Sequence, residues 1–141
     1  MSKPNVSQED DAPEAESAVL KSVALKFVEA INAGDPERLT ALQTEDFTFI
    51  DMSGYVERGR QGWQDYFSTY PKYKIHVEHV LTGGSGVAII GKTTDSHIPP
   101  EVEEKETVLW TAEIQNGLVA EWRIYSDTDE IKKKMSQKFK P

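Results

Sequence analysis

The chain contains no cysteine. This excludes a disulfide framework, a thiolate nucleophile and a zinc site built from thiolates. Basic residues are also few, because 16 Lys and Arg stand against 24 Asp and Glu and give a formal net charge of −8. Proteins that bind the phosphate backbone of nucleic acids need a basic face, so we expect no nucleic-acid partner.

Long apolar runs are missing as well. No stretch approaches the roughly 18 apolar residues that a membrane span requires, and residues 1–11 lack the apolar core of a secretory signal peptide. The sequence therefore predicts a cytoplasmic protein without a membrane partner. It also lacks the glycine-rich phosphate-binding and dinucleotide-binding motifs and the nucleophile elbow. We accordingly expect no cofactor, and no metal.

The chain has the length of a single domain. It has 141 residues, of which 38% are hydrophobic and 28% charged, as is typical of a globular protein. Residues 1–16 are polar, acidic and contain proline, so we expect a disordered tail there. We predict one folded domain over residues 17–135, followed by a basic tail over residues 136–141.

Three helices are predicted in the first half of the chain. Apolar residues recur every three or four positions from Ser17 to Ile31, which indicates an amphipathic helix. Gly34 suits the left-handed end of that helix. Asp35 and Pro36 suit the N-cap and first residue of a short second helix. A third helix is indicated by an aromatic stripe at i, i+3, i+4 and i+7, formed by Trp63, Tyr66, Phe67 and Tyr70.

The remaining segments alternate with a period of two, which is typical of strands. A first strand is predicted from Phe47 to Asp51, with a brief return over Tyr55–Glu57. Longer strands are expected over residues 73–81, 87–98, 102–115 and 118–126, and a short helix from Asp127. Asn116-Gly117 is a strong hairpin signal. Helices followed by consecutive hairpins predict an α+β fold, in which helices cover a strongly bent mixed or antiparallel sheet around a cone-shaped pocket.

Three blocks of sequence resemble the nuclear transport factor 2-like superfamily, in particular its SnoaL-like polyketide cyclase and ketosteroid isomerase branches. They are FVEAINAGD at residues 27–35, FTFID with GRQGW at residues 47–63, and GLVAEWRIYSD at residues 117–127. The resemblance runs from about Ser17 to Ile131 and implies the cystatin-like α+β roll. It does not by itself fix the function, because this fold hosts enzymes, binding modules and transport adaptors.

The resemblance carries over unevenly to catalytic residues. Asp51 matches the general-base aspartate of the isomerase. Phe27 stands where the isomerase has its oxyanion tyrosine, and Trp110 stands where it has a hydrogen-bonding aspartic acid. The loss of one such donor typically costs about 10²–10³ in rate. We therefore do not expect a ketosteroid isomerase proper, whereas a cyclase-like or dehydratase-like site stays open.

Asp51 has two interpretations. It alternates with Phe47 and Phe49, so it could face an apolar cavity, where lost hydration would raise its pKa and make it a proton acceptor. Alternatively, it caps the turn that follows it through an Asx hydrogen bond. In the first case Tyr55, Tyr66 or a histidine would donate the proton.

Four further residues are candidates with structural alternatives. His79 and His97 could act in the pocket, although a hydrogen-bonded structural or surface histidine is the commoner role. Glu106 could reach the pocket rim or lie in water. Asp127 is similar in position to a SnoaL-like catalytic aspartate, but its spacing to Glu130 favours a helix N-cap.

The sequence predicts a protein with an apolar pocket for a small apolar or aromatic molecule. If it is an enzyme, we expect a cofactor-independent isomerase, cyclase or dehydratase that uses Asp51; the alternative is a non-catalytic binding or assembly domain. A homodimer is expected through the outer sheet face, where Leu109, Val119 and Tyr125 lie among polar residues. The predicted pocket residues are Phe27, Phe49, Tyr55, Trp63, Tyr66, Phe67, His79, His97, Trp110 and Trp122.

Overall fold

The computed structural model describes residues 3–58 and 61–125, with the backbone alone for residues 3–14 and 61. In this part of the chain no helix is both long and apolar enough to cross a bilayer. The helix expected from Asp127 and the basic tail lie outside the described residues. The helices are α1 (Lys3–Ala33), α2 (Pro36–Ala41), α3 (Gln61–Thr69) and α4 (Pro100–Glu103). The strands are β1 (Gln43–Ile50), β2 (Val56–Arg58), β3 (Lys74–Gly83), β4 (Gly86–Thr94), β5 (Val108–Gln115) and β6 (Leu118–Tyr125).

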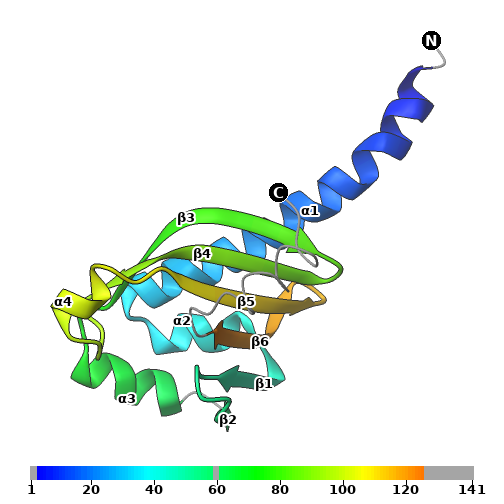
Figure 1. The fold of residues 1–141 in the computed structure, drawn as a ribbon. Coiled ribbons are helices and arrows are strands. Elements are labelled where there is room, and N and C mark those ends of the chain that lie inside the picture. Colours follow the sequence, from blue (N-terminus) through cyan, green and yellow to red (C-terminus); the bar gives the residue numbers. More distant parts are fainter. Residues whose placement is uncertain (1–2, 59–60, 126–141) are drawn as a thin grey trace.

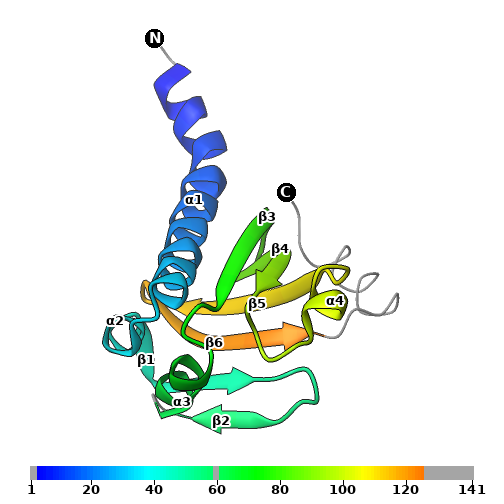
Figure 2. The ribbon, with the colours of Figure 1, turned by 90° about the vertical axis from the view of Figure 1, so that its left-hand side faces the viewer.

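The six strands form one mixed sheet in the order β2-β1-β6-β5-β4-β3. Strands β3 to β6 are antiparallel neighbours in chain order, and β1 pairs with β6 in parallel and with β2 antiparallel. The sheet bends, and α1, α2 and α3 lie on one side of it (Figures 1 and 2). The predicted α+β class with a strongly bent, helix-covered sheet is confirmed.

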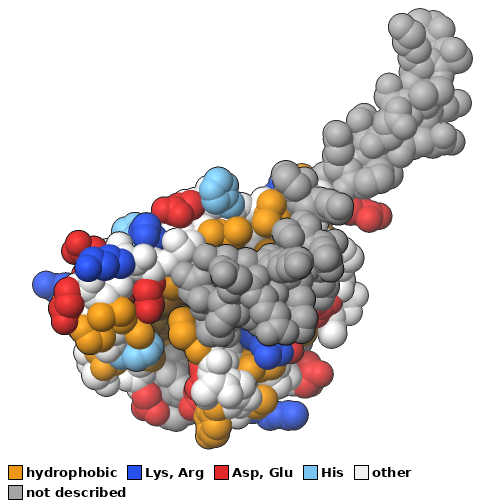
Figure 3. Space-filling model, viewed as in Figure 1, with side chains coloured by type: hydrophobic (Ala, Val, Ile, Leu, Met, Phe, Trp, Pro, Cys, Tyr) orange, Lys and Arg blue, Asp and Glu red, His pale blue; other side chains and the backbone are white. Residues whose placement is uncertain are grey.

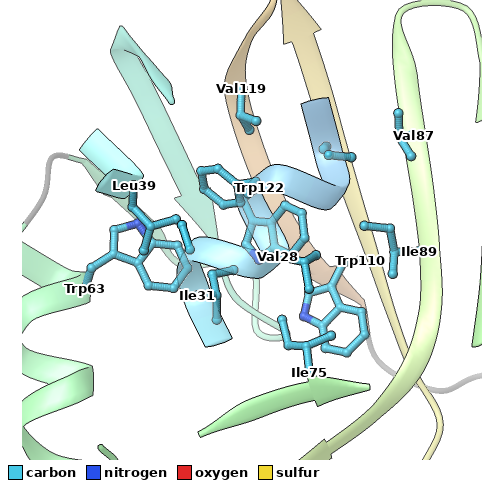
Figure 4. Packing of buried hydrophobic residues seen from close by; sticks show 14 of the residues in the cluster. Val28, Ile31, Leu39, Trp63, Ile75, Val87, Ile89, Trp110, Val119 and Trp122 are labelled. Atoms are coloured by element: carbon cyan, nitrogen blue, oxygen red, sulfur yellow. The ribbon is translucent and has the colours of Figure 1, made fainter. Parts of the chain in front are cut away.

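Helix α1 lies across the inner face of the sheet and contacts β3, β4, β5 and β6. Phe27 and Ile31 of this helix are fully buried, and so are Trp110 of β5 and Trp122 of β6. The two indole rings stack with centroids 6.4 Å apart (Figure 4). The Phe27 ring lies 5.0 Å from that of Trp122. The aromatic core therefore joins the first helix to the last two strands.

Local signals in the sequence set several element ends. Gly34 adopts a left-handed φ of 62° after α1. The Asp35 carboxylate accepts a hydrogen bond of 3.1 Å from the backbone N–H of Arg38 at the start of α2. Asn116 and Gly117 both have positive φ, 53° and 79°, as the tight turn between β5 and β6 requires.

Helix α1 begins at Lys3, not near Ser17 as the sequence predicts. Its first turns extend away from the sheet (Figure 1), so they are helical where we expected a disordered tail. A helix that is already nucleated gains one hydrogen bond for each added residue, which lets it extend past its packed face. The expected limit of the folded domain at residue 17 stays a prediction.

The connection between β4 and β5 also differs from the sequence prediction. Strand β4 ends at Thr94 and β5 begins at Val108, whereas we expected strands over residues 87–98 and 102–115. The short helix α4 intervenes because Pro100 fits the first turn of a helix and acidic residues favour that turn. The connection is therefore a folded segment that packs against β4.

Strand β3 contains a bulge that the alternation pattern conceals. Val77 pairs with Gly91 and His79 pairs with Ile90, which leaves Glu78 as an extra residue. The inward face changes there: Ile75 is buried before the bulge, and Val80 packs on the core after it. Gly91 is required opposite the bulge, because a Cβ atom added there would lie 2.1 Å from a backbone carbonyl oxygen of β3.

Candidate functional site

The strand register places a row of side chains on the inner face of the sheet. Glu57 of β2 pairs with Phe49 of β1, Phe49 pairs with Trp122 of β6, and Trp122 pairs with Ala112 of β5. Directly paired residues point to the same face of a sheet. The Glu57 side chain therefore shares the face of Phe49 and Trp122, at the edge of the aromatic core.

Helix α3 covers the end of this row and leaves a cavity of about 90 Å³. Its apolar lining with few polar groups is typical of a small-molecule site. Hydrophobic side chains also gather at the surface over α3 and α4 (Figure 3). The cavity is lined by Phe49, Glu57, Gly62, Trp63, Tyr66, Tyr73, Trp122 and Ile124.

A smaller cavity of about 50 Å³ adjoins the first, because Tyr66, Tyr73 and Ile124 line both. Its wall is more polar and includes Thr93, Ser96, His97 and Glu106, together with Met52, Ile98, Val108 and Trp110. Glu57 and Gly62 line the larger cavity and His97 and Glu106 the smaller one, so the combined space has two chemically different ends.

A hydrogen-bonded pair forms the polar wall of the smaller cavity. The Tyr66 hydroxyl lies 3.0 Å from Nδ1 of His97 and accepts a hydrogen bond of 3.3 Å from the backbone N–H of His97. Burial raises the pKa of Tyr66 above its ordinary value of 10.0, outweighing the opposite effect of the His97 backbone N–H. Tyr66 is therefore protonated at neutral pH. It can donate its one hydrogen into the cavity when Nδ1 of His97 carries a hydrogen and donates it to the phenol oxygen.

A buried carboxylate lies behind this pair. Glu103 of α4 is 5% exposed, and its Oε2 accepts hydrogen bonds from the Thr93 hydroxyl at 2.6 Å and from the Ser96 hydroxyl. The Ser96 hydroxyl oxygen also accepts a hydrogen bond of 3.1 Å from the backbone N–H of Ile98. Glu103 thus ties α4 to β4 and holds the segment that carries His97.

Asp51 does not have the environment of a buried base. Its Oδ1 accepts hydrogen bonds from the Ser53 hydroxyl at 2.6 Å, the Ser53 backbone N–H at 2.9 Å and the Tyr55 backbone N–H at 3.0 Å. The Ser53 hydroxyl bond is the largest effect, and with the backbone N–H groups it lowers the pKa of Asp51 despite some desolvation. The prediction of a raised pKa is wrong, and the turn-capping alternative describes the observed contacts.

The structure brings six of the predicted pocket residues together around the two cavities: Phe49, Trp63, Tyr66, His97, Trp110 and Trp122. Phe27 and Phe67 are instead core residues behind the lining, where each packs its ring against Trp63. Tyr55 lies on the surface with 63% exposure, since the turn after Asp51 carries it away from the core. His79 is exposed because the bulge at Glu78 reverses the facing of the strand.

Several lining or supporting residues were not predicted from the sequence, among them Tyr73, Glu57 and Glu103. Tyr73 follows the proline that ends α3 and is buried against the Tyr66 ring, with centroids 5.1 Å apart. Glu57 could have been inferred from its pairing with Phe49, but the register of so short a strand is not visible in the sequence. No sequence pattern indicated the supporting role of Glu103, because this residue lies in a segment that was predicted to be a strand.

The prediction for the outer sheet face is wrong at Val119. Val119 is fully buried, since a register shift between Glu113 and Ile114 turns it inward. Leu109 and Tyr125 remain partly exposed, with the Arg123 guanidinium 4.9 Å from the centre of the Tyr125 ring. The homodimer through this face stays a prediction that sedimentation equilibrium at micromolar concentration can test. Asp127 lies outside the described residues.

The described residues contain no group of three His, Asp or Glu side chains that could hold a metal ion. Trp110 lines the smaller cavity, and its indole N–H is buried without a hydrogen-bond partner among those residues.

This arrangement, a bent sheet covered by helices around an aromatic cavity, defines the class of cystatin-fold, nuclear transport factor 2-like proteins. A family model described as a SnoaL-like domain matches residues 24–122, so the chain belongs to the SnoaL-like domain family. No curated protein matches the chain.

Solved structures share the fold at low sequence identity. An uncharacterised cystatin-fold protein from Novosphingobium aromaticivorans is 17% identical with a TM-score of 0.65, and the match covers 77% of this chain and 97% of that one. A protein from Sinorhizobium meliloti classed as a polyketide cyclase is 16% identical with a TM-score of 0.62, over 73% and 93% of the two chains. A protein from Kribbella flavida classed as a ketosteroid isomerase is 19% identical with a TM-score of 0.60, over 77% of each chain.

Proposed function

We propose that the two adjoining cavities bind a small, mostly apolar molecule whose carbonyl oxygen meets the Tyr66 hydroxyl. The observation that carries this proposal is the aromatic cavity itself, which ends in the hydrogen-bonded Tyr66–His97 pair. Membership in the SnoaL-like family supports it, as does the likeness to a structure classed as a polyketide cyclase.

The same groups could carry out acid–base chemistry. Tyr66 stays protonated, so it would stabilise negative charge that develops on a carbonyl oxygen. Glu106 lines the same cavity and would accept the proton from the neighbouring carbon. The resulting enolate is the common intermediate of isomerisation, cyclisation and dehydration. Asp51 is not part of this proposal because three hydrogen bonds within the turn engage its Oδ1 and lower its pKa, which makes it a weaker base.

A binding experiment tests the site. We expect small cyclic and aromatic ketones to quench tryptophan fluorescence and raise the melting temperature. Tyr66→Phe should weaken ketone binding about fivefold, because the loss of a hydrogen bond costs about 1 kcal/mol, and should leave a hydrocarbon of the same shape unaffected. Tyr55→Phe is the matched control, since Tyr55 is exposed. Equal ketone binding by wild type and Tyr66→Phe would contradict the proposal.

A second experiment separates an enzyme from a binding domain. Exchange of the hydrogen next to the ketone carbonyl for deuterium in D₂O, followed by NMR, reports proton abstraction without knowledge of the natural product. We expect wild type and Glu104→Gln, the exposed control on the same connection, to catalyse the exchange and Glu106→Gln to be slower by 10² or more. Tight ketone binding without exchange would favour the non-catalytic binding domain instead.

A further inference from the structure

Among the described residues, the larger cavity has a single charged side chain in its lining, the Glu57 carboxylate. Glu57 lines it at the edge of the sheet, and the register with Phe49 directs this side chain to the inner face. No lysine or arginine among the described residues lines either cavity. A ligand anion would therefore meet carboxylates and aromatic rings, and no described cation would pair with it.

The Glu57 carboxylate is held close to the start of α3. A Cβ atom added at Gly62 would lie 3.0 Å from Oε2 of Glu57, so glycine at this position leaves room for the carboxylate. The Glu57 side chain is exposed on its other side. It can therefore pair with a ligand cation at the cavity mouth without either ion losing all of its hydration, which is the main cost of a buried ion pair.

Aromatic side chains surround the space that such a cation would enter. Phe49, Trp63 and Trp122 line the same cavity, and the Phe49 and Trp63 rings lie 5.8 Å apart with an interplanar angle of 59°. Aromatic faces attract ammonium groups through the quadrupole of the ring. A carboxylate next to an aromatic wall is thus suited to a protonated amine attached to an apolar body.

We propose that the larger cavity takes a ligand that carries a positively charged amino group, which pairs with Glu57 while its apolar body contacts Trp63 and Trp122. This inference rests on the proposed binding function of the cavity. It adds the charge and the orientation of the ligand: the amino group lies at the Glu57 end and the carbonyl oxygen at the Tyr66–His97 end.

Three probes of one shape test it by calorimetry on the full chain: 2-phenylethylamine, 2-phenylethanol and 3-phenylpropionate. We expect the amine to bind about five- to tenfold more tightly than the alcohol, as one exposed ion pair together with one cation–π contact would give, and the carboxylate to bind most weakly. Glu57→Gln should reduce amine affinity to that of the alcohol and leave alcohol affinity unchanged. Glu78→Gln, an exposed glutamate on β3, is the matched control and should behave as wild type.

Each result decides the proposal. Equal affinity for amine and alcohol, or an unchanged amine preference in Glu57→Gln, overturns it while the binding function survives. If none of the three probes binds and the ketones also fail, both proposals fall. If Glu57→Gln does not fold, salt titration of the wild type replaces it: amine affinity should fall with added NaCl and alcohol affinity should not. A carboxylate that only caps α3 would lower stability on replacement without changing the ratio of amine to alcohol affinity.

Discussion

The turn after β1 and the connection between β4 and β5 are both short polar segments that border the smaller cavity, through Met52 and His97 respectively. In the turn, the three donors to the Asp51 carboxylate come from within four residues. In the connection, Glu103 accepts hydrogen bonds from Thr93 and Ser96, and His97 reaches Tyr66 on α3. The Asp51 carboxylate accepts hydrogen bonds only within its own turn, whereas Glu103 joins α4 to β4. The hydrogen bond between His97 and Tyr66 then joins this connection to α3.

This difference identifies which polar residues support the site. A carboxylate satisfied by its own turn would keep those contacts in almost any fold, so its presence says little about a cavity. A carboxylate satisfied by a strand and a loop depends on the tertiary structure and fixes the position of whatever that loop carries. Glu103, rather than Asp51, therefore determines the geometry around His97 and Tyr66.

The largest effect is expected for Glu103→Ala. It leaves the buried Thr93 hydroxyl and the partly buried Ser96 hydroxyl without their acceptor, and we expect a loss of about 2–3 kcal/mol in the free energy of unfolding. Urea denaturation measures this loss. Glu101→Ala, an exposed glutamate of the same helix, should change stability by less than about 0.5 kcal/mol. Similar losses for the two variants would remove the distinction between a supporting and a surface glutamate.

The stability of the protein should depend on pH through the phenols of Tyr66 and Tyr73, which line the smaller cavity. Burial raises the pKa values of Tyr66 and Tyr73 above their ordinary value of 10.0, and Glu103 adds a smaller repulsion at both. A raised pKa means that the stabilisation by the neutral phenols is present below pH 10 and is lost as the pH rises through their folded-state pKa values, with a slope of at most about 1.4 kcal/mol per pH unit for one fully buried group. Tyr73→Phe should therefore lose stability less steeply than wild type between pH 9.5 and 11. Parallel stability profiles would show that Tyr73 ionises equally in the folded and unfolded chain.

Asp51→Asn should cost about 0.5–1 kcal/mol at pH 7, because the amide keeps the hydrogen bonds to the turn but loses their charge-assisted part. The lowered pKa of Asp51 makes this stabilisation present above its ordinary value of 3.8 and lost as the pH falls through the folded-state pKa. The difference between wild type and variant should therefore shrink at pH 3. Stabilisation by Asp51→Asn at pH 7 would revive the interpretation of Asp51 as a buried base.

The smallest effect is expected for Ser53→Ala. It removes the hydroxyl that most lowers the pKa of Asp51, and the two backbone N–H donors remain. We expect the pKa of Asp51 to move up toward its ordinary value of 3.8, with a stability change of about 0.5 kcal/mol or less. Carboxylate NMR titration measures the shift. An unchanged pKa would mean that the backbone donors alone determine it.

Much of the fold could be predicted because its signals are local. Gly34, Asp35 and the Asn116-Gly117 turn act through their own local backbone, and the stripe of Trp63, Tyr66 and Phe67 is a property of a single helix. The residues that line the cavity were harder to predict. His97 lines it and His79 does not, yet both are single histidines in segments of alternating pattern. One extra residue in β3 turned His79 outward, and bulges leave no mark in an alternation pattern. The end of β4 at Thr94 placed His97 in the connection that reaches Tyr66.

The sequence by itself determined the α+β class, the hairpins, the helix caps and the abundance of aromatic residues for a pocket, because hydrogen bonds within a few residues and apolar periodicity encode them. Only the tertiary structure decided which side chains meet in that pocket. Three contacts join separate elements in this way. They are the pairing of Glu57 with Phe49, the hydrogen bond from Ser96 to Glu103 and the contact of Tyr66 with His97. Such contacts depend on strand register and on helix placement, which the packing of the whole core fixes.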